Sequence, residues 1–373
     1  MQIGRRLLEV ISAVLEAAEH KRADVALREA LRTANLSPPE KSHVTHLVFS
    51  FYRWRGWLDL KKPLRGQLEH VNDLVEKFAA NPNSFSDSEL LQRALPAWSK
   101  DLIPVSAALI REFQHEPRLW LRARPGKGAE LVAKLKDAVP HGNVPDVLWY
   151  QGRQDLFRTS LFHEGQFELQ DLSSQAVGHA CAPVPGQTWW DVCAGEGGKT
   201  LHLCDLMQNK GTVWASDPAE WRLANLKRRA GRAKLFNYRL APWAHKDHLP
   251  TKTKFDGILV DAPCSGTGTW GRNPQARWTT TPDDVKELSE IQLGILNKIA
   301  GSVKPGGKLI YAVCTLARPE TNTVADAFTA GHPDFEALEL SNPINPDQRS
   351  TRFELLPHQV NANGMFIAAW RRK

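Results

Sequence analysis

The chain has 373 residues, of which 42% are hydrophobic and 24% are charged, and this composition excludes a disordered or fibrous protein. Its 48 Lys and Arg residues exceed its 41 Asp and Glu residues, and the net charge of +7 suits a polyanionic partner. No apolar segment approaches the roughly 20 residues of a membrane-spanning helix, and Glu9 and Glu16 interrupt the first apolar stretch before it could serve as an export signal. We therefore expect a cytoplasmic protein with more than one domain and no membrane contact.

Residues 1–85 predict a helical domain. Apolar residues recur at helical spacing between Leu7 and Ala18. A second helix is expected after Ser37, because a serine N-cap with Glu40 three residues later forms a capping box. Cations and aromatics alternate in residues 53–57, where they could stack on nucleic-acid bases or simply pack.

Residues 86–168 predict a small intermediate α/β unit. The turn-rich residues 81–88 indicate a linker in front of it. Within the unit we expect a strand at 119–123 and an amphipathic helix at 129–138.

From about residue 169 to 373, strands alternate with helices, as is typical of a parallel, doubly wound sheet. Ligands of such sheets lie at the carboxyl ends of the strands, near the point where the strand order reverses. The expected strands are 188–194, 212–217, 235–240, 255–261, 308–314 and 365–370.

A glycine-rich turn follows the first of these strands, in residues 191–200 (DVCAGEGGKT). Glycines permit a close approach of the backbone to a ligand, and this loop is compatible with a dinucleotide, a phosphate or adenosylmethionine. The next strand ends at Asp217, a position that binds a ribose diol in nucleotide-binding sheets and that can also cap the following helix.

Residues 222–239 contain seven Lys and Arg residues and no acidic residue. This concentration of charge indicates either a solvated helix face or a contact with a nucleic-acid backbone.

The five cysteines include no C-x-x-C pair, so neither a disulfide framework nor a zinc site is expected. Cys181 and Cys204 are expected to be buried in the core. Cys264 follows the strand 255–261 closely, and Cys314 ends the strand 308–314. Two thiols at the tips of two strands indicate a catalytic pair.

Methylation of carbon 5 of cytosine would explain two thiols. That carbon is a poor nucleophile, and adding a thiolate to carbon 6 gives carbon 5 carbanion character. A second thiolate can then remove the proton from carbon 5 as general base. Asp261 could bind the ring-nitrogen edge of the base and stabilise the addition intermediate.

Three motifs resemble the Sun/NSUN (RsmB-like) family of RNA cytosine-5 methyltransferases. They are DVCAGEGGKT from Asp191, LVDAPCSGTGTWGRNPQARW from Leu259 and YAVCTLARPETN from Tyr311. The resemblance implies a Rossmann-like class I methyltransferase domain at 169–373, preceded by a NusB-like RNA-binding domain at 1–85 and the intermediate unit at 86–168.

The resemblance also implies the roles of individual residues. Cys314 would be the nucleophile, Cys264 would release the product, and Asp261 would assist catalysis. The residues implied to bind S-adenosylmethionine are Cys193, Ala194, Gly195, Glu196, Gly197, Gly198, Lys199, Asp217, Arg222 and Asp261. Arg272, Asn273, Pro274 and Trp278 match the segment that trails the first catalytic cysteine. The expected partner is RNA, with ribosomal RNA favoured over tRNA, and we expect a monomer that needs no metal.

The chain departs from the family pattern in three places. Glu196 stands where the family usually has proline. An adenine-binding aspartate is missing around residues 240–242, with Asp247 as a substitute, and the segment between Cys314 and Glu320 is one residue longer. These departures leave open an RNA-binding factor with a decayed catalytic site. Methylation of DNA is a further alternative, although DNA enzymes would not require Cys314.

Overall fold

The computed structural model describes residues 3–244 and 248–373. Its contacts divide the chain into two compact units, each built from two stretches of sequence. The helical unit comprises Met1–Pro117 and Gly266–Pro282, and the sheet unit comprises Arg118–Ser265 and Asp283–Lys373. Among the described residues, no helix is long and apolar enough to cross a membrane.

The helical unit confirms the helices expected at the start of the chain. Helix α3 begins at Pro38, where the Glu40 carboxylate accepts the Ser37 N–H at 2.7 Å. Leu7, Ile11 and Val14 of α1 are buried on one face. The helices are α1 (Arg5–Ala17), α2 (Ala23–Thr33), α3 (Pro38–Trp54), α4 (Leu64–Ala80), α5 (Asp87–Arg93), α6 (Ser99–Leu102), α7 (Ala107–Gln114) and α13 (Ala276–Thr279).

The alternating cations and aromatics near the end of α3 are largely packed inside the unit. Arg53 and Trp54 are buried, and the Arg53 guanidinium donates to the Gly271 carbonyl at 3.1 Å. The Trp57 indole N–H donates to Glu89 at 2.7 Å. Of the two interpretations of this cluster, packing therefore accounts for these three residues.

The segment Gly266–Pro282 is held in the helical unit by two polar side chains. The Gln275 amide oxygen accepts the Ala23 N–H at 2.6 Å, and its nitrogen donates to the Ala18 carbonyl at 2.5 Å. The fully buried Arg277 donates to Gln114 at 2.8 Å. The motif that trails Cys264 in sequence is thus built into the helical unit.

The division into compact units differs from the boundaries expected at residues 85 and 168. Phe85, inside the expected linker, is buried and packs on the rings of Trp54 and Phe78 at 5.0 and 6.0 Å. Helices α5 to α7 therefore stay with the helical unit, and the chain passes to the sheet unit at Pro117–Arg118.

The main sheet confirms the doubly wound α/β architecture. Its order is β10-β14-β9-β8-β5-β6-β7, with β13 paired to β14. The strands from β9 to β7 are parallel to their neighbours, whereas β14 runs antiparallel to β9. The strands are β5 (Thr188–Asp191), β6 (Thr212–Ala215), β7 (Tyr238–Leu240), β8 (Phe255–Asp261), β9 (Val303–Val313), β10 (Phe335–Ala337), β13 (Arg352–Leu355) and β14 (Met365–Arg372).

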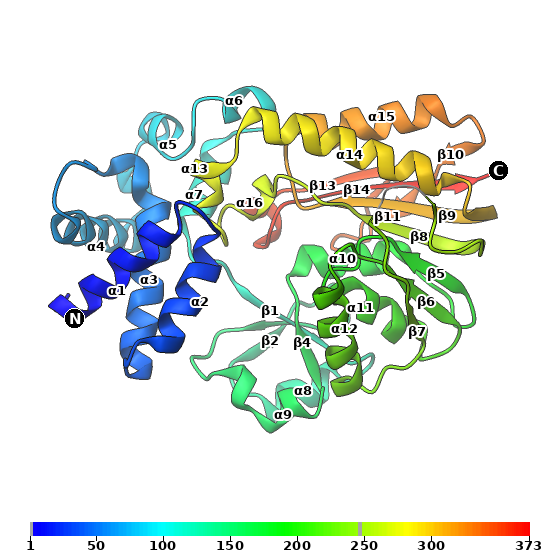
Figure 1. The fold of residues 1–373 in the computed structure, drawn as a ribbon, viewed down its shortest axis with the longest axis horizontal. Coiled ribbons are helices and arrows are strands. Elements are labelled where there is room, and N and C mark those ends of the chain that lie inside the picture. Colours follow the sequence, from blue (N-terminus) through cyan, green and yellow to red (C-terminus); the bar gives the residue numbers. More distant parts are fainter. Residues whose placement is uncertain (1–2, 245–247) are drawn as a thin grey trace. The chain divides into compact units, whose positions relative to one another are not determined.

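Helices cover both faces of this sheet (Figure 1). Helices α10 (Leu172–Cys181), α11 (Gly198–Leu206) and α12 (Glu220–Arg232) lie on one face, and α14 (Pro282–Ala300) and α15 (Asn322–Gly331) lie on the other. Each layer buries its own apolar core against the sheet. Cys181 and Cys204 are buried in the first of these cores, as expected.

A separate antiparallel sheet of order β2-β3-β1-β4 forms the start of the sheet unit. Its strand β1 (Leu119–Ala123) has the expected bounds, but the helix expected at 129–138 ends earlier. Helix α8 (Gly128–Lys134) stops because Leu135 is already in an extended conformation, and Asp137, with a left-handed φ of 65°, then leads into β2. The remaining elements are β2 (Ala138–Pro140), β3 (Val147–Tyr150), α9 (Ser160–His163), β4 (Phe167–Leu169), β11 (Leu340–Ser341), β12 (Arg349–Ser350) and α16 (Pro357–Val360).

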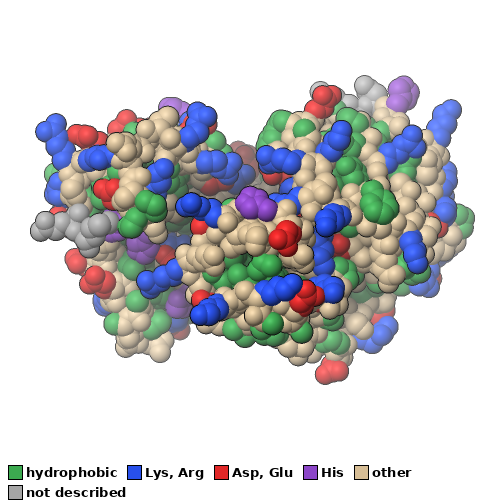
Figure 2. Space-filling model, turned by 90° about the horizontal axis from the view of Figure 1, so that it is seen from below, with side chains coloured by type: hydrophobic (Ala, Val, Ile, Leu, Met, Phe, Trp, Pro, Cys, Tyr) green, Lys and Arg blue, Asp and Glu red, His purple; other side chains and the backbone are tan. Residues whose placement is uncertain are grey.

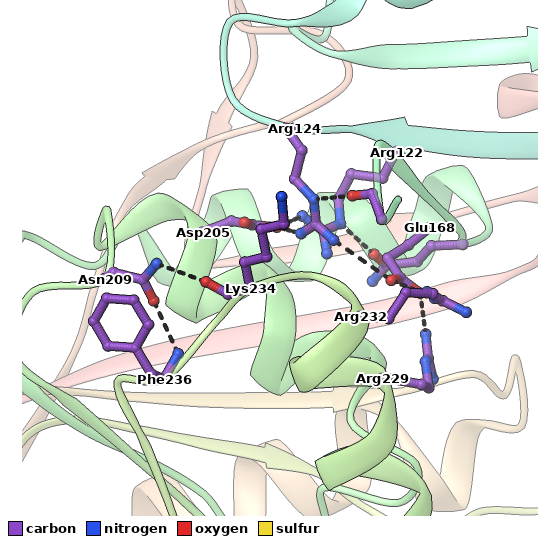
Figure 3. A network of polar contacts seen from close by, with 11 residues as sticks. Arg122, Arg124, Glu168, Asp205, Asn209, Arg229, Arg232, Lys234 and Phe236 are labelled. Atoms are coloured by element: carbon purple, nitrogen blue, oxygen red, sulfur yellow. Dashed lines mark hydrogen bonds and ion pairs between the residues drawn. The ribbon is translucent and has the colours of Figure 1, made fainter. Parts of the chain in front are cut away.

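Three expected strands of the main sheet are shorter than the sequence pattern indicated: β5 ends at Asp191 rather than at 194, β6 ends at Ala215 rather than at 217, and β7 starts late. Strand β7 begins at Tyr238 rather than at Leu235. Lys234 has a left-handed φ of 55°, and the Phe236 N–H is bound by the Asn209 side chain at 3.1 Å. Both features remove residues 234–236 from strand pairing (Figure 3).

A buried network of ion pairs joins the small sheet to α11 and α12 (Figure 3). Arg122 and Arg124 of the small sheet bind Asp205 of α11, Arg124 at 2.7 Å. Glu168 of β4 binds Arg229 and Arg232 of α12 at 3.0 and 2.5 Å.

Candidate active site

The site lies where the strand order of the main sheet reverses. Strand β5 pairs with β6 on one side and β8 on the other, and the carboxyl ends of these parallel strands share one edge. The glycine loop follows β5, Asp217 follows β6, Cys264 follows β8 and Cys314 follows β9. The topology therefore gathers the residues expected from the sequence at a single edge of the sheet.

The glycine loop turns sharply between β5 and α11. Gly195 and Gly197 have left-handed φ values of 53° and 86°, which favour glycine. A Cβ on Gly197 would come within 2.5 Å of the Leu226 side chain, so this glycine is needed for packing. A Cβ on Gly195 or Gly198 would meet no atom within 4 Å, so the loop leaves open space there.

Asp217 is buried and is connected to the glycine loop. Its carboxylate accepts the Gly195 N–H at 3.0 Å and the Ala219 N–H at 2.8 Å. The Arg222 guanidinium lies 3.7 Å from the same carboxylate and is about half exposed. The structure thus brings together Gly195, Asp217 and Arg222, three of the residues that the resemblance implies for cofactor binding.

Glu196 lies on the exposed side of the loop. Its backbone carbonyl accepts a hydrogen bond from Arg229 at 2.9 Å, so the loop is held through its main chain. The substitute acid suggested from the sequence, Asp247, lies outside the described residues. At the position of the missing aspartate, Ala241 is buried and its carbonyl accepts the Ser216 hydroxyl at 2.6 Å.

The two cysteine thiols are in contact. Cys264 Sγ and Cys314 Sγ are 3.4 Å apart, although the residues are 50 positions apart in sequence. The hydrogen bond from Cys264 lowers the pKa of the Cys314 thiol below its usual 9.0, and the charge of Lys199 acts in the same direction against burial and Asp261. The environment therefore favours a thiolate on Cys314.

Lys199 and Asp261 form an ion pair next to the thiols. The Lys199 ammonium lies 2.6 Å from the Asp261 carboxylate, and the lysine side chain is about one-tenth exposed. Burial on its own would lower the pKa of Lys199, but the neighbouring Asp261 raises it above 10.5. The ammonium is therefore kept charged inside the site.

Burial raises the pKa of two further groups at the end of β5. Burial raises the pKa of Asp191 to about 7, although the Thr200 hydroxyl donates to it at 2.7 Å. Burial and the neighbouring carboxylates raise the pKa of the Cys193 thiol well above 9.0. Cys193 is thus a poor nucleophile, in contrast to Cys314.

The sequence analysis gave no functional role to Glu320, which the structure places beside both cysteine loops. Its fully buried carboxylate accepts the Ser265 N–H at 2.8 Å and the Thr315 hydroxyl at 3.0 Å. Ser265 follows Cys264 and Thr315 follows Cys314. The only sequence signal was that Glu320 falls inside the motif that carries Cys314.

The basic stretch at 222–239 is divided between two environments. Arg229 and Arg232 are engaged with Glu168 and are mostly buried. The other cations of the stretch are exposed: Arg222, Lys227, Arg228, Lys234 and Arg239. Figure 2 shows a face of the molecule on which Lys and Arg side chains are spread among fewer acidic ones. The two interpretations of the stretch, a solvated helix face or a contact with a nucleic-acid backbone, thus apply only to these five exposed residues.

Comparisons with known proteins agree with this geometry. The family model "16S rRNA methyltransferase RsmB/F" matches residues 179–371. A relative from Klebsiella pneumoniae, "Ribosomal RNA small subunit methyltransferase B", is 31% identical over 84% of this chain and 74% of its own length. A Bacillus subtilis protein, "Probable ribosomal RNA small subunit methyltransferase B", is 40% identical over 58% of this chain and 50% of its own length, so that match spans half of the relative.

A solved structure extends the likeness to the fold. The methyltransferase homologue from Pyrococcus horikoshii superposes with a TM-score of 0.60 at 25% identity, covering 72% of this chain and 90% of that one. The family match covers both cysteines, the glycine loop and Glu320. The chain belongs to the 16S rRNA methyltransferase RsmB/F family.

Proposed function

We propose that this protein transfers a methyl group from S-adenosylmethionine to carbon 5 of a cytosine in 16S ribosomal RNA. The observation that carries the proposal is the contact between the Cys264 and Cys314 sulfurs, 3.4 Å apart beside the Lys199–Asp261 ion pair. A single nucleophile would suffice for many transferases. A thiol pair at one point suits a reaction that both forms and breaks a bond from cysteine to the substrate.

The residues at the sheet edge fit adenosylmethionine. The open space beside Gly195 and Gly198 allows a ligand to approach the loop backbone. The buried Asp217 carboxylate lies next to this space, at the position that binds a ribose diol in this type of sheet. When bound, the cofactor supplies an electrophilic methyl group. Glu196, with its exposed side chain, leaves the space open.

In the first step the Cys314 thiolate adds to carbon 6 of the cytosine. A carbon–sulfur bond forms, and the electron pair of the 5,6 double bond moves to carbon 5. The charged Lys199 next to Asp261 favours the negative charge that develops on the ring. If adenosylmethionine is bound at this edge of the sheet, its sulfonium would supply the methyl group to carbon 5, and the rest of the cofactor would leave as a neutral thioether.

In the second step Cys264 acts as the general base. The Cys264 thiol first loses its proton to water, its thiolate then takes the proton from carbon 5, the double bond re-forms, and Cys314 leaves carbon 6 as a thiolate. The 3.4 Å separation of the sulfurs supports this role, because a base on Cys264 would lie close to the bond from Cys314 that breaks. Each cysteine thus has one role, and the lowered pKa of the Cys314 thiol supports its assignment as the nucleophile.

The substrate assignment rests on family membership and on the surplus of positive charge. Bisulfite sequencing of ribosomal RNA and tRNA from cells with and without the gene tests it. We expect one cytosine of 16S rRNA to be protected only when the gene is present, and a Cys314→Ala copy not to restore protection. Protection of a tRNA cytosine instead would contradict the substrate assignment.

Calorimetry separates this proposal from the alternative of a non-catalytic RNA-binding factor. Tight binding of adenosylmethionine by the full chain supports an enzyme. An absence of binding, together with unchanged bisulfite patterns, would favour the alternative.

A further inference from the structure

Glu320 is a fully buried carboxylate that is reached by four hydrogen bonds. One oxygen accepts the Ser265 N–H at 2.8 Å and the Gln292 side-chain amide at 3.0 Å. The other accepts the hydroxyls of Thr315, at 3.0 Å, and of Ser265. Each oxygen thus has two donors, and the carboxylate is held rigidly in its site.

These donors flank the two catalytic cysteines. Ser265 directly follows Cys264, and Thr315 directly follows Cys314. The Ser265 and Thr315 hydroxyls are also only 3.0 Å apart. A single side chain therefore fastens the loop of the general base to the loop of the nucleophile.

A second layer of hydrogen bonds supports the residues before the cysteines. The Gln292 amide also donates to the Pro263 carbonyl at 2.9 Å. The Tyr311 hydroxyl lies near both the Gln292 side-chain oxygen, at 2.8 Å, and the Glu320 carbonyl, at 2.6 Å. Residues on both sides of each cysteine are thus hydrogen-bonded to one cluster, formed by Glu320, Gln292 and Tyr311.

The Glu320 carboxylate is held by neutral donors. Burial raises the pKa of Glu320 above 4.5, against the hydrogen bonds from Ser265, Gln292 and Thr315. Such a buried acid is costly to the fold unless every lone pair is satisfied. An apolar residue in its place would leave these four donors without an acceptor, so Glu320 and its donors act as one unit.

We propose that Glu320 is a positioning residue, which holds Cys264 and Cys314 at the separation that nucleophile and general base require. This inference rests on the proposed function of the two cysteines. Glu320 acts on the reaction through the loops and does not touch the substrate.

Substitution of Glu320 in the full chain tests this role. In Glu320→Gln the side-chain oxygen can still accept from the Ser265 N–H and the Gln292 amide. The side-chain NH2 group would face the Ser265 and Thr315 hydroxyls, so the variant preserves the cluster. Glu320→Ala removes all four bonds. Ser265→Ala is a milder variant that loses only the hydroxyl, and Glu336→Ala, on the exposed strand β10, is the matched control.

The first readout is the pH dependence of Cys314 alkylation by iodoacetamide, followed by peptide mass spectrometry without RNA or cofactor. The Cys264 thiol lowers the pKa of Cys314 only while the sulfurs are in contact. We expect the alkylation midpoint to rise in Glu320→Ala, to rise less in Ser265→Ala, and to match wild type in Glu320→Gln and Glu336→Ala. A wild-type midpoint in a folded Glu320→Ala protein would overturn the proposal.

The second readout is methylation. A displacement of reacting groups by about 1 Å can cost roughly 100-fold in rate, so Glu320→Ala should lower kcat by about that factor without changing the KM for the cofactor. An unchanged kcat would also overturn the proposal. If wild type methylates no cytosine, the proposed function fails, but the alkylation profile still decides whether Glu320 sets the contact between the sulfurs. If Glu320→Ala does not fold, the midpoint of Ser265→Ala decides in its place.

Discussion

The ion-pair network around Glu168 gives a stability prediction whose size follows from the structure. The Glu168 side chain is 2% exposed and lies within 3.6 Å of three guanidinium groups, those of Arg124, Arg229 and Arg232. Glu168→Gln keeps the size of the side chain but leaves these cations without that negative charge. Removing one partner of a buried ion pair costs about 3–5 kcal/mol. Because the three arginines retain 15–21% exposure to water, we expect the lower end, about 3 kcal/mol.

Urea unfolding at neutral pH, followed by circular dichroism, measures this loss. The control is Glu164→Gln, an exposed residue four positions earlier, for which a change within about 0.5 kcal/mol is expected. Burial opposes ionisation of Glu168, but Arg229 and Arg232 lower its pKa below 4.5. Its contribution is therefore present above pH 4.5 and is lost as pH falls through the folded-state pKa. The reasoning would be refuted if Glu168→Gln lowered the free energy of unfolding by less than about 1 kcal/mol at neutral pH, or if the difference from wild type grew in acid.

Two other predictions concern the cofactor loop and the nucleophile. Arg229→Ala and Arg232→Ala each lose a bond to Glu168, but only Arg229 also binds the Glu196 carbonyl, at 2.9 Å. Calorimetry should therefore show that Arg229→Ala binds adenosylmethionine about tenfold more weakly, which corresponds to a loss of about 1.4 kcal/mol in binding free energy. Arg232→Ala should bind the cofactor with little change. Equal affinities of the two variants would contradict a role of the Arg229–Glu196 contact in cofactor binding. Lys199→Met removes a charge that lowers the pKa of Cys314, so the rising limb of the pH–rate profile should move to higher pH, and an unmoved limb would count against a thiolate nucleophile.

Six of the eight strands of the main sheet and the edge at which the site lies were predicted from the sequence, whereas β10 and β13 were not. Strand β8 has the expected bounds, because its apolar run ends at the charged Asp261. Both thiols were expected at strand tips, but their contact was not, because it depends on β8 and β9 being adjacent in the sheet. Strand β7 was predicted too long, because the left-handed turn at Lys234 and its bond to Asn209 leave no mark on the pattern of apolar residues.

Contacts between residues distant in sequence could not be predicted from one chain. Gln275 binds Ala18 and Ala23 across more than 250 residues, and these bonds place residues 266–282 in the helical unit. Glu320 receives donors from positions 28 and 55 residues earlier in the chain. In the sequence it is one acid in a turn, and its importance becomes visible only when burial and all four donors are seen together.

The account depends above all on the separate roles of the two cysteines. Full-length Cys264→Ala protein, incubated with 16S rRNA and adenosylmethionine, tests these roles directly by denaturing gel electrophoresis. Without the general base the methylated adduct cannot be released, so we expect a protein–RNA complex that survives denaturation and that disappears in the Cys264→Ala/Cys314→Ala double variant. A Cys264→Ala enzyme that turns over normally, or an adduct that persists without Cys314, would contradict the mechanism.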